Sequence, residues 1–141
     1  MSSWSFGASV PPDVAHIESN PALAHSGSGY LHVSRTTCDP LSTDVASTTL
    51  SFPPSPSSAE ITAVRFFYMR PAATGARYVA NGNSLPQALT WTEKILCYYQ
   101  SSGFVQNLVF SNWALCTGSF SPDDLYVDDV SVTTVPTCPA G

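Results

Sequence analysis

The sequence predicts an all-β protein, folded as a two-sheet antiparallel β-sandwich of the jelly-roll type. About eight to ten short segments rich in Val, Thr, Tyr and Phe follow one another along the chain. Turns containing Gly, Pro, Asn or Ser separate them at intervals of about ten residues, which is typical of a sandwich or jelly roll. With 141 residues the chain can enclose one core. We therefore assign residues 1–141 to a single domain, with 135–141 as the start of a C-terminal linker.

The first half of the chain contains four expected strands. A short strand at 14–17 follows an irregular Gly/Pro-rich start, and a second strand at 30–34 follows a Gly/Ser turn. A Thr/Ser-rich strand at 45–52 ends at a run of prolines, because proline cannot donate a hydrogen bond to a sheet. The most apolar segment, 61–69, is long enough for a helix, but its alternation and its aromatic and β-branched residues favour a strand.

The second half of the chain contains five more expected segments. They are 76–80, 88–100, 104–110, 112–116 and 125–132. Asn81-Gly82-Asn83 is a strong turn signal, although the residues after it are too irregular to predict a tight hairpin. The segment 88–100 reads as one long strand or two with a bend, and within it 88–96 also allows a helix.

Charge and hydropathy exclude several partners. The net charge is −5, and the five basic residues are scattered, so no patch exists that would neutralise the phosphates of a nucleic acid or an anionic membrane. No apolar run approaches the ~20 residues that a membrane-spanning helix needs. The first residues lack the basic and apolar regions of a signal peptide. We expect a secreted, extracellular protein whose signal peptide is absent from this chain.

The four cysteines, which are Cys38, Cys97, Cys116 and Cys138, include no close pair of the kind that binds zinc or performs redox chemistry. Disulfides are the better interpretation. Of the three possible connectivities we favour Cys97 with Cys116, which are near in sequence, and Cys38 with Cys138, which would hold the tail. If 95–100, 104–110 and 113–116 formed a regular meander, however, Cys97 and Cys116 would lie two strands apart and could not bond. Free buried thiols are the remaining alternative.

A change of register marks the last expected strand. Leu125 and Val127 alternate with one parity, and Val130 and Val132 with the other. The simplest device that shifts parity is a β-bulge, which here falls at Asp128-Asp129. Two adjacent carboxylates need a reason at such a position. Binding of Ca²⁺ is one reason, and hydrogen bonding to the backbone amides of a neighbouring loop is the other.

Two motifs carry a resemblance to a known family. The late segment 125–132, Leu-Tyr-Val-Asp-Asp-Val-Ser-Val, and the early Gly/Ser-rich segment 24–33 together resemble the jelly-roll carbohydrate-binding modules of the CenC type. The extracellular MAM adhesion domains and the concanavalin-like domains of polysaccharide lyases share this pattern, as do galactose-binding-like jelly rolls more broadly. The CenC resemblance implies a structural Ca²⁺ bound by Asp128 or Asp129. The N-terminal segment that completes the site in that family is missing here, and Asp13 or Glu18 would have to substitute.

Aromatic and amide side chains gather in the middle of the sequence, mostly between 91 and 113. Aromatic rings offer a flat apolar surface to the C–H face of a sugar, and amides and guanidinium groups bond its hydroxyls. Packing in the core is the competing role for each ring. Because Tyr98 shares the face of the core residue Leu96, Tyr99 is expected to point outward. The predicted ligand-binding residues are Arg77, Asn81, Trp91, Tyr99, Gln106 and Trp113.

Catalysis finds less support in the sequence. A glycosidase needs two carboxylates across a cleft, but the adjacent acids Asp123-Asp124 and Asp128-Asp129 alternate between faces. Isolated acids, which are Asp44, Glu60 and Glu93, read as surface residues. The three histidines, His16, His25 and His32, lack metal-ligand spacing along the chain, although His32 shares a strand face with Tyr30.

The leading hypothesis is therefore a non-catalytic, secreted carbohydrate-binding module that binds a polysaccharide and belongs beside other modules of a larger parent protein. One alternative is a protein-interaction or adhesion module of the MAM type, which long, flat apolar strands would favour. The other is a small jelly-roll polysaccharide lyase or hydrolase. A lyase would use a set of His, Tyr and Arg to remove a proton beside a carboxylate of the sugar, with the arginine balancing the charge.

Overall fold

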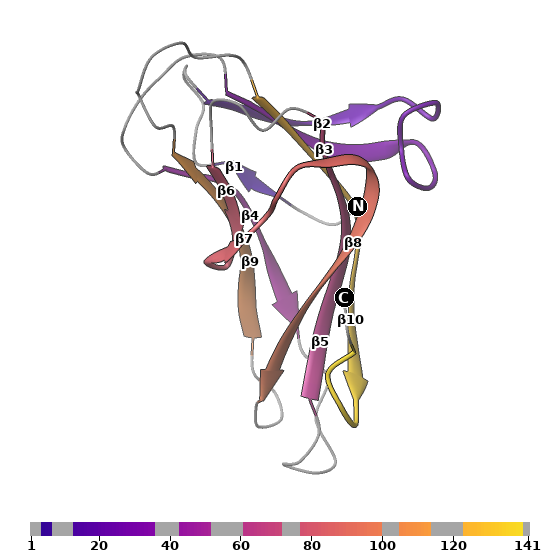
Figure 1. Cartoon of the computed structure of the whole chain (residues 1–141), viewed down its shortest axis with the longest axis vertical. Helices are drawn as coiled ribbons and strands as arrows, with labels where there is room; N and C mark the ends of the chain where they lie inside the picture. Colours follow the sequence, from indigo (N-terminus) through magenta and orange to yellow (C-terminus); the bar gives the residue numbers. More distant parts are fainter. Residues whose placement is uncertain are drawn as a thin grey trace.

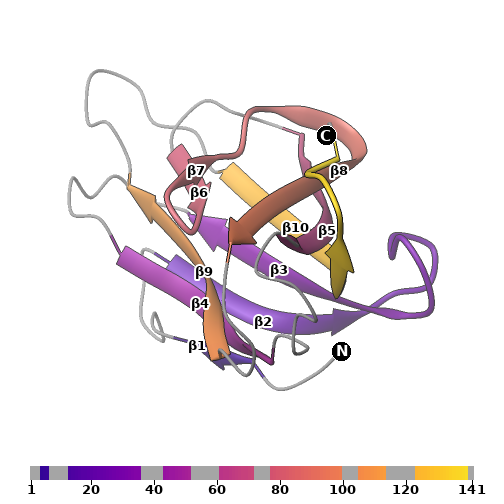
Figure 2. The same ribbon diagram turned by 90° about the horizontal axis from the view of Figure 1, so that it is seen from below.

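The computed structural model describes residues 4–6, 13–35, 43–51, 61–71, 77–99, 105–113 and 123–139. These residues form ten β-strands arranged as two five-stranded antiparallel sheets, which Figures 1 and 2 show as two facing layers. The predicted all-β sandwich is confirmed. Nothing in the described ranges is a helix of the length and apolarity needed to cross a lipid bilayer.

The first sheet has the strand order β1-β4-β9-β6-β7. Its strands are β1 (Ser5–Phe6), β4 (Thr43–Ser51), β6 (Arg77–Ala80), β7 (Asn83–Ser84) and β9 (Val105–Trp113). Strand β9 is central and pairs with β4 on one side and β6 on the other. The predicted break near residue 111 is wrong, because Ser111 pairs with Asp44 and Val79 in one continuous strand.

The second sheet has the strand order β2-β3-β10-β5-β8. Its strands are β2 (Asp13–Ser19), β3 (Gly29–Arg35), β5 (Ile61–Arg70), β8 (Ala88–Tyr99) and β10 (Asp123–Val135). The segment that also allowed a helix at 88–96 is part of β8, because six of its residues pair with β5. Strands β8 and β9 follow each other in sequence but belong to different sheets, so no meander forms between them.

The core lies between the two sheets. Val64, Phe66 and Tyr68 project inward from alternate positions of β5, as period-2 patterning requires. The fully buried ring of Phe66 meets Phe110 of the opposite sheet edge to face, with centroids 5.4 Å apart. Burying such a side chain stabilises the fold by about 1.5–3 kcal/mol. The residues of β5 between these positions, including Phe67, face outward, so the second sheet has an outer face of its own.

A tight hairpin joins β6 to β7 through Asn81 and Gly82. Ala80 and Asn83 are direct partners, and the two residues between them have φ angles of 46° and 80°. Positive φ at both central positions defines a type I′ turn, which Asn-Gly favours because glycine has no Cβ and asparagine tolerates the left-handed region. The prediction that no tight hairpin would follow this turn signal is wrong. The strand after it is only two residues long, which left little pattern to read.

The predicted bulge at Asp128-Asp129 is confirmed. Asp128 pairs with Phe67, but the next pair joins Ser131 to Arg65, so β10 has one residue more than β5 in this interval. Asp129 takes up the extra length in the left-handed region, with φ of 53°. The register shift returns Val132 to the core side, where it packs against the buried residues.

Both predicted disulfide pairings that involve described residues are wrong, because Cys97 bonds Cys138. Their Cα atoms lie 6.0 Å apart. Strand β5 lies between β8 and β10, and Val135, Ile61 and Tyr99 are at the same level of the three strands. The tail therefore has only to cross the end of β5 to reach β8. Strands β8 and β9 belong to different sheets, and Cys38 and Cys116 lie outside the described residues.

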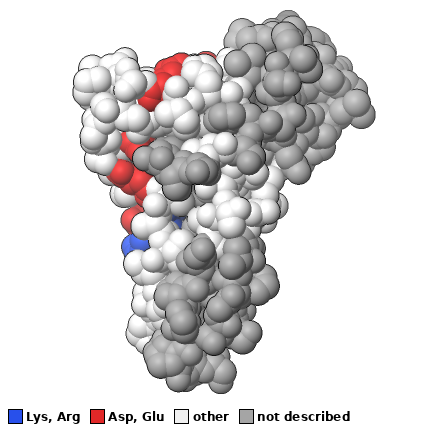
Figure 3. Space-filling model, turned by 180° about the vertical axis from the view of Figure 1, so that it is seen from behind, with Lys and Arg blue, Asp and Glu red and all other residues white. Residues whose placement is uncertain are grey.

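The surface is more acidic than basic. Figure 3 shows acidic atoms gathered at one end and along one edge of the face in view, with few basic atoms beside them. Of the basic side chains, Arg70 is buried, where it donates to the carbonyl of Leu85 at 2.6 Å, and Arg65 lies 3.6 Å from Glu93. The exposed charge on the outer face of the second sheet is therefore mainly negative.

Candidate functional site

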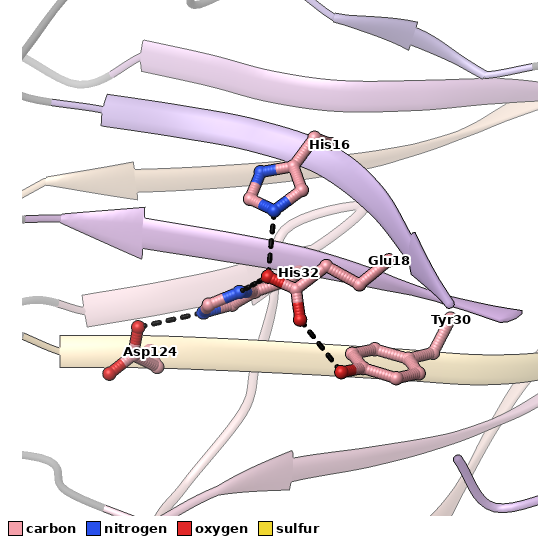
Figure 4. Close-up of polar contacts among 5 residues, drawn as sticks. All are labelled: His16, Glu18, Tyr30, His32 and Asp124. Carbon is pink, nitrogen blue, oxygen red and sulfur yellow. Dashed lines mark hydrogen bonds and ion pairs between the residues drawn. The ribbon is translucent and has the colours of Figure 1, made fainter. Parts of the chain in front are cut away.

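Strands β2 and β3 bring four polar side chains together on the outer face of the second sheet. In their antiparallel ladder His16 lies opposite His32, and Glu18 lies opposite Tyr30. Residues two apart on a strand share a face, and directly opposite Cβ atoms lie about 5 Å apart. The pattern His-x-Glu on one strand and Tyr-x-His on the next thus produces a compact cluster, drawn in Figure 4.

The carboxylate of Glu18 is the centre of this cluster. Its Oε1 lies 2.7 Å from Nε2 of His16 and 2.6 Å from Nδ1 of His32. Its Oε2 accepts a hydrogen bond from the hydroxyl of Tyr30 at 2.7 Å. Both oxygens of one carboxylate are thereby held by three side chains, which orient Glu18 toward the two imidazole rings (Figure 4).

A second carboxylate holds the other side of His32. Nε2 of His32 lies 2.8 Å from Oδ1 of Asp124 on β10. The ring of Tyr126 stacks on that of His32 at a centroid distance of 4.5 Å and an interplanar angle of 15°. His32 is only 16% exposed, so its orientation is set by two carboxylates and an aromatic ring.

The electrostatics of the cluster keep Glu18 charged and Tyr30 neutral. Hydrogen bonds from His32 and Tyr30 lower the pKa of Glu18 to about 2, against a smaller opposing effect of burial. Burial, followed by the hydrogen bond to Glu18, raises the pKa of Tyr30 to about 12. Burial also raises the pKa of Tyr126, and the negative charges of Asp124 and Glu18 add to this effect. Near neutral pH the cluster therefore presents a carboxylate and a phenol, with no phenolate.

The Asp128-Asp129 bulge lies on the same sheet and holds the loop between β2 and β3. Oδ2 of Asp128 accepts from the backbone N–H groups of His25 and Ser26 at 3.0 and 3.2 Å, and Oδ1 accepts from the N–H of Asp129 at 2.8 Å. The carboxylate of Asp129 contacts Nδ1 of His25 and accepts from the hydroxyl of Ser26, both at 2.5 Å. Of the two roles expected for this pair, hydrogen bonding to a loop's amides is the one that these contacts describe.

These contacts bear on the expected calcium site. All four carboxylate oxygens of Asp128 and Asp129 already have a hydrogen-bonding partner in the protein, which is a poor starting point for a cation that takes 6–8 oxygen ligands. Glu18, one expected substitute ligand, contacts His16, Tyr30 and His32 instead. Calcium binding at this pair stays a prediction.

The same loop packs on aromatic side chains of the outer face. The imidazole of His25 stacks on Phe67 with centroids 3.8 Å apart, and it meets Trp91 edge on at 5.8 Å. Trp91 donates its Nε1 hydrogen to the carbonyl of Leu23 at 2.9 Å. The loop is thus fastened across β10, β5 and β8.

The residues predicted to bind ligand are divided between the two sheets. Arg77 and Trp113 are direct partners in the β6–β9 ladder, and Gln106 pairs with Leu50. Trp91 and Tyr99 belong to β8 in the second sheet. The structure describes the backbone but not the side chains of four of them, which are Arg77, Tyr99, Gln106 and Trp113. Their binding role stays a prediction.

Asn81 has a structural role in the described residues. Its Oδ1 accepts from the N–H of Val109 at 2.8 Å, and its Nδ2 donates to the hydroxyl of Tyr98 at 2.9 Å. Tyr98 packs against the core, as its parity with Leu96 predicted. Asn81 therefore ties the β6–β7 turn to β9 and to the other sheet.

Sequence spacing missed the cluster of His16, Glu18 and His32. The histidines lack metal-ligand spacing along the chain, yet the ligand atoms of His16, Glu18 and His32 all lie within 4.8 Å of one another. The spacing that matters runs across the hairpin rather than along the chain. The signal was present as two short alternating motifs, but only the register of β2 on β3 makes them neighbours.

No protein-family model and no curated protein matches the chain. Solved structures do match. Tailspike protein 4 of bacteriophage CBA120 aligns with a TM-score of 0.61 and 10% identity, over 94% of this chain and 19% of that one. An exo-β-agarase aligns with a TM-score of 0.56 and 9% identity, over 98% and 24%. The CBM22-1–GH10 modules of xylanase Xyn10B from Clostridium thermocellum align with a TM-score of 0.51 and 14% identity, over 92% and 26%.

These likenesses concern the fold alone, because the identities are low. The chain spans about a fifth to a quarter of the three proteins just named. Several separate carbohydrate-binding modules also match, with TM-scores of 0.35 to 0.49. Membership of the CenC type stays a prediction.

Proposed function

We propose that the protein is a non-catalytic, secreted carbohydrate-binding module that binds a polysaccharide across the outer face of the second sheet. The observation that carries the proposal is a row of rings on four neighbouring strands of this face. Its members are His32 on β3, Tyr126 on β10, Phe67 on β5 and Trp91 on β8. His25 of the β2–β3 loop stacks on Phe67, so the ring faces left for a glycan are mainly those of Tyr126 and Trp91. The Cys97–Cys138 disulfide and the structures with this fold support the extracellular setting.

The geometry of the row suits an extended glycan. Adjacent strands lie about 4.8 Å apart, so four strands set the ends of the row roughly 14 Å apart. That length fits an oligosaccharide better than a single sugar. Tyr126 and Trp91 are partly exposed, and ring faces pack on the C–H faces of pyranoses. Glu18 and Asp124 beside the row offer carboxylate oxygens to sugar hydroxyls.

The charge of this face favours a neutral glycan. Glu18, Asp124 and Asp129 lie on it, and the nearby Arg65 contacts Glu93. The whole chain carries a net charge of −5, and Figure 3 shows acidic atoms at one end and along one edge of the face in view. A polyuronate or sulfated polysaccharide would therefore be repelled, with a strength that depends on salt.

The contacts of the cluster argue for binding rather than proton transfer. A lyase would need a histidine or tyrosine free to take a proton from the sugar. Tyr30 is only 1% exposed and donates to Glu18, and both ring nitrogens of His32 contact carboxylates. These groups are held by each other, which suits a binding surface.

Affinity electrophoresis on soluble polysaccharides tests the proposal. Neutral glucans, xylans and galactans are compared with polyuronates, each run with Ca²⁺ and with a chelator. We expect one neutral class to retard the protein, and Tyr126→Ala or Trp91→Ala to reduce the retardation by about tenfold in apparent affinity, as a loss of ~1.4 kcal/mol would. The matched control is Thr49→Ala, on an exposed position of the first sheet. Retardation that survives both ring truncations would contradict the proposed face.

The chelator arm addresses the remaining predictions. If binding is lost with chelator and restored by Ca²⁺ but not by Zn²⁺, the Asp128-Asp129 calcium site gains support. If Arg77→Ala or Trp113→Ala abolishes retardation while Tyr126→Ala does not, the glycan binds to the first sheet, where the sequence placed most of its ligand residues. Mobility unchanged on every glycan would favour the interaction-module alternative.

A further inference from the structure

We propose that His16, Glu18 and His32 form a binding site for a divalent transition metal, with Zn²⁺ as its best-suited occupant. Nε2 of His16, a carboxylate oxygen of Glu18 and Nδ1 of His32 are the three donor atoms, and they lie within 4.8 Å of one another. This inference does not depend on the proposed glycan function. The site does not include Asp128 or Asp129, the expected calcium pair; it shares only Glu18 with the expected substitute calcium ligands.

The donor set selects the kind of metal. Two imidazoles and one carboxylate suit zinc and its neighbours, whereas Ca²⁺ takes oxygen ligands. Zinc lies ~2.0 Å from nitrogen and oxygen ligands, so two ligands at a tetrahedral angle are about 3.3 Å apart. Oε1 of Glu18 now lies 2.7 and 2.6 Å from the two histidine nitrogens. Small side-chain rotations would lengthen both of these separations to about 3.3 Å.

Two of the proposed metal ligands already have hydrogen-bonding partners of the kind that orient metal ligands in proteins. Metal-bound histidine usually donates its second N–H to a carboxylate, which fixes the ring and raises its basicity. Nε2 of His32 lies 2.8 Å from Asp124, which leaves Nδ1 to face the site. The hydroxyl of Tyr30 donates to Oε2 of Glu18 and leaves Oε1 toward the histidines. Both inner ligands are thus oriented by independent partners.

The position of the cluster makes the site accessible and leaves it open. Strand β2 is the edge of the second sheet, and the side chain of His16 is 47% exposed. Three protein ligands leave a fourth position of a tetrahedral zinc ion for water or an added ligand. The backbone is held by seven consecutive pairs of the β2–β3 ladder, so the donors need little reorganisation to meet the ion.

Calorimetric titration of the chelator-treated full chain with ZnCl₂ tests the site. We expect one saturable site, no comparable heat with CaCl₂, and a Co²⁺ derivative with the visible absorption of nitrogen and oxygen ligation. His16→Ala and Glu18→Gln should each weaken Zn²⁺ binding at least tenfold. The chain has only three histidines, so His25→Ala, which removes the one outside the cluster, is the matched control and should keep the affinity.

Three results would overturn the proposal: no Zn²⁺ binding to the folded chain, binding that His16→Ala and Glu18→Gln leave unchanged, or binding that His25→Ala abolishes. Thermal unfolding of each variant without metal shows whether the variant is folded before its Zn²⁺ affinity is compared with that of the parent chain. His16 is the best first position for this purpose, because its exposed side chain on an edge strand contributes little to the core.

Discussion

Asp124 on β10 and His32 on β3 meet at 2.8 Å although 92 residues separate them in the chain. The contact exists because β10 pairs with β3 and places Tyr126 opposite His32, with Asp124 two residues further along the same face. On the other side of the ring lies Glu18, contributed by β2. A single imidazole thus joins three strands of one sheet.

The contact between Asp124 and His32 gives a prediction for the metal site. Asp124→Asn keeps the shape of the side chain but removes the charge that orients His32. We expect Zn²⁺ affinity to fall by roughly 10–100-fold, as is typical for partners of metal-bound histidines. Calorimetry measures the change, with Glu93→Gln as the control because that acid contacts Arg65 instead. Equal affinity of Asp124→Asn and the parent chain would show that Asp124 has no part in orienting the ring.

Phe66 and Phe67 are adjacent residues with opposite roles, which mutation should separate. Phe66 is fully buried against Phe110, so Phe66→Ala should lower the free energy of unfolding by about 3–5 kcal/mol. Phe67 lies on the outer face under His25, so Phe67→Ala should cost no more than about half as much and should weaken glycan binding. Urea unfolding and affinity electrophoresis on the two variants provide the test. A larger stability loss for Phe67→Ala would reverse the assignment of faces.

The pH dependence of stability should report the contact of Asp129 with the loop. Burial alone would raise the pKa of Asp129, but hydrogen bonds from His25 and Ser26 outweigh it and hold the pKa below the ordinary value of 3.8. A folded-state pKa below the unfolded one gives stability that is present above pH ~4 and disappears as the pH falls through the lowered value. Because the side chain is 35% exposed, we expect only about 1 kcal/mol.

Urea unfolding of the parent chain and Asp129→Asn measures that contribution. Asparagine also tolerates the left-handed backbone at this position, so the variant isolates the charge. The difference between the two proteins should be largest near pH 6 and should shrink toward pH 3. A difference that stays constant over this interval would mean that the carboxylate charge does not stabilise the loop.

The Cys97–Cys138 bond should be a main contributor to stability. It closes a separation of 41 residues, for which the chain-entropy model gives about 4 kcal/mol, and native disulfides typically contribute 2–5 kcal/mol. Replacing both cysteines with serine should lower the free energy of unfolding by that amount. Peptide mapping without reduction should recover the peptide that joins residues 97 and 138. Recovery of a 97–116 peptide would instead restore the pairing that sequence proximity suggests.

The sequence by itself determined several of the strands and which of their residues face the core. Alternation in 61–69 predicted β5 because a half-buried strand must place apolar residues at every second position. The parity change between Val127 and Val130 predicted the bulge for the same reason, and Leu96 correctly assigned Tyr98 to the core. Each of these inferences uses neighbours within a few residues, where the backbone geometry alone fixes which way a side chain points.

Only the tertiary structure decided which strands are partners. It placed β8 and β9 in different sheets, which removed the meander, and it placed β5 alone between β8 and β10, which lets Cys138 reach Cys97. It set the register of β2 on β3 and of β3 on β10, which assembled the cluster around Glu18. Strand order and register depend on how much apolar surface all the strand pairings bury together. A local sequence pattern does not contain that information. The alternation within each strand therefore fixes which residues face outward. The pairing of the strands decides which of those outward residues become neighbours in a candidate site.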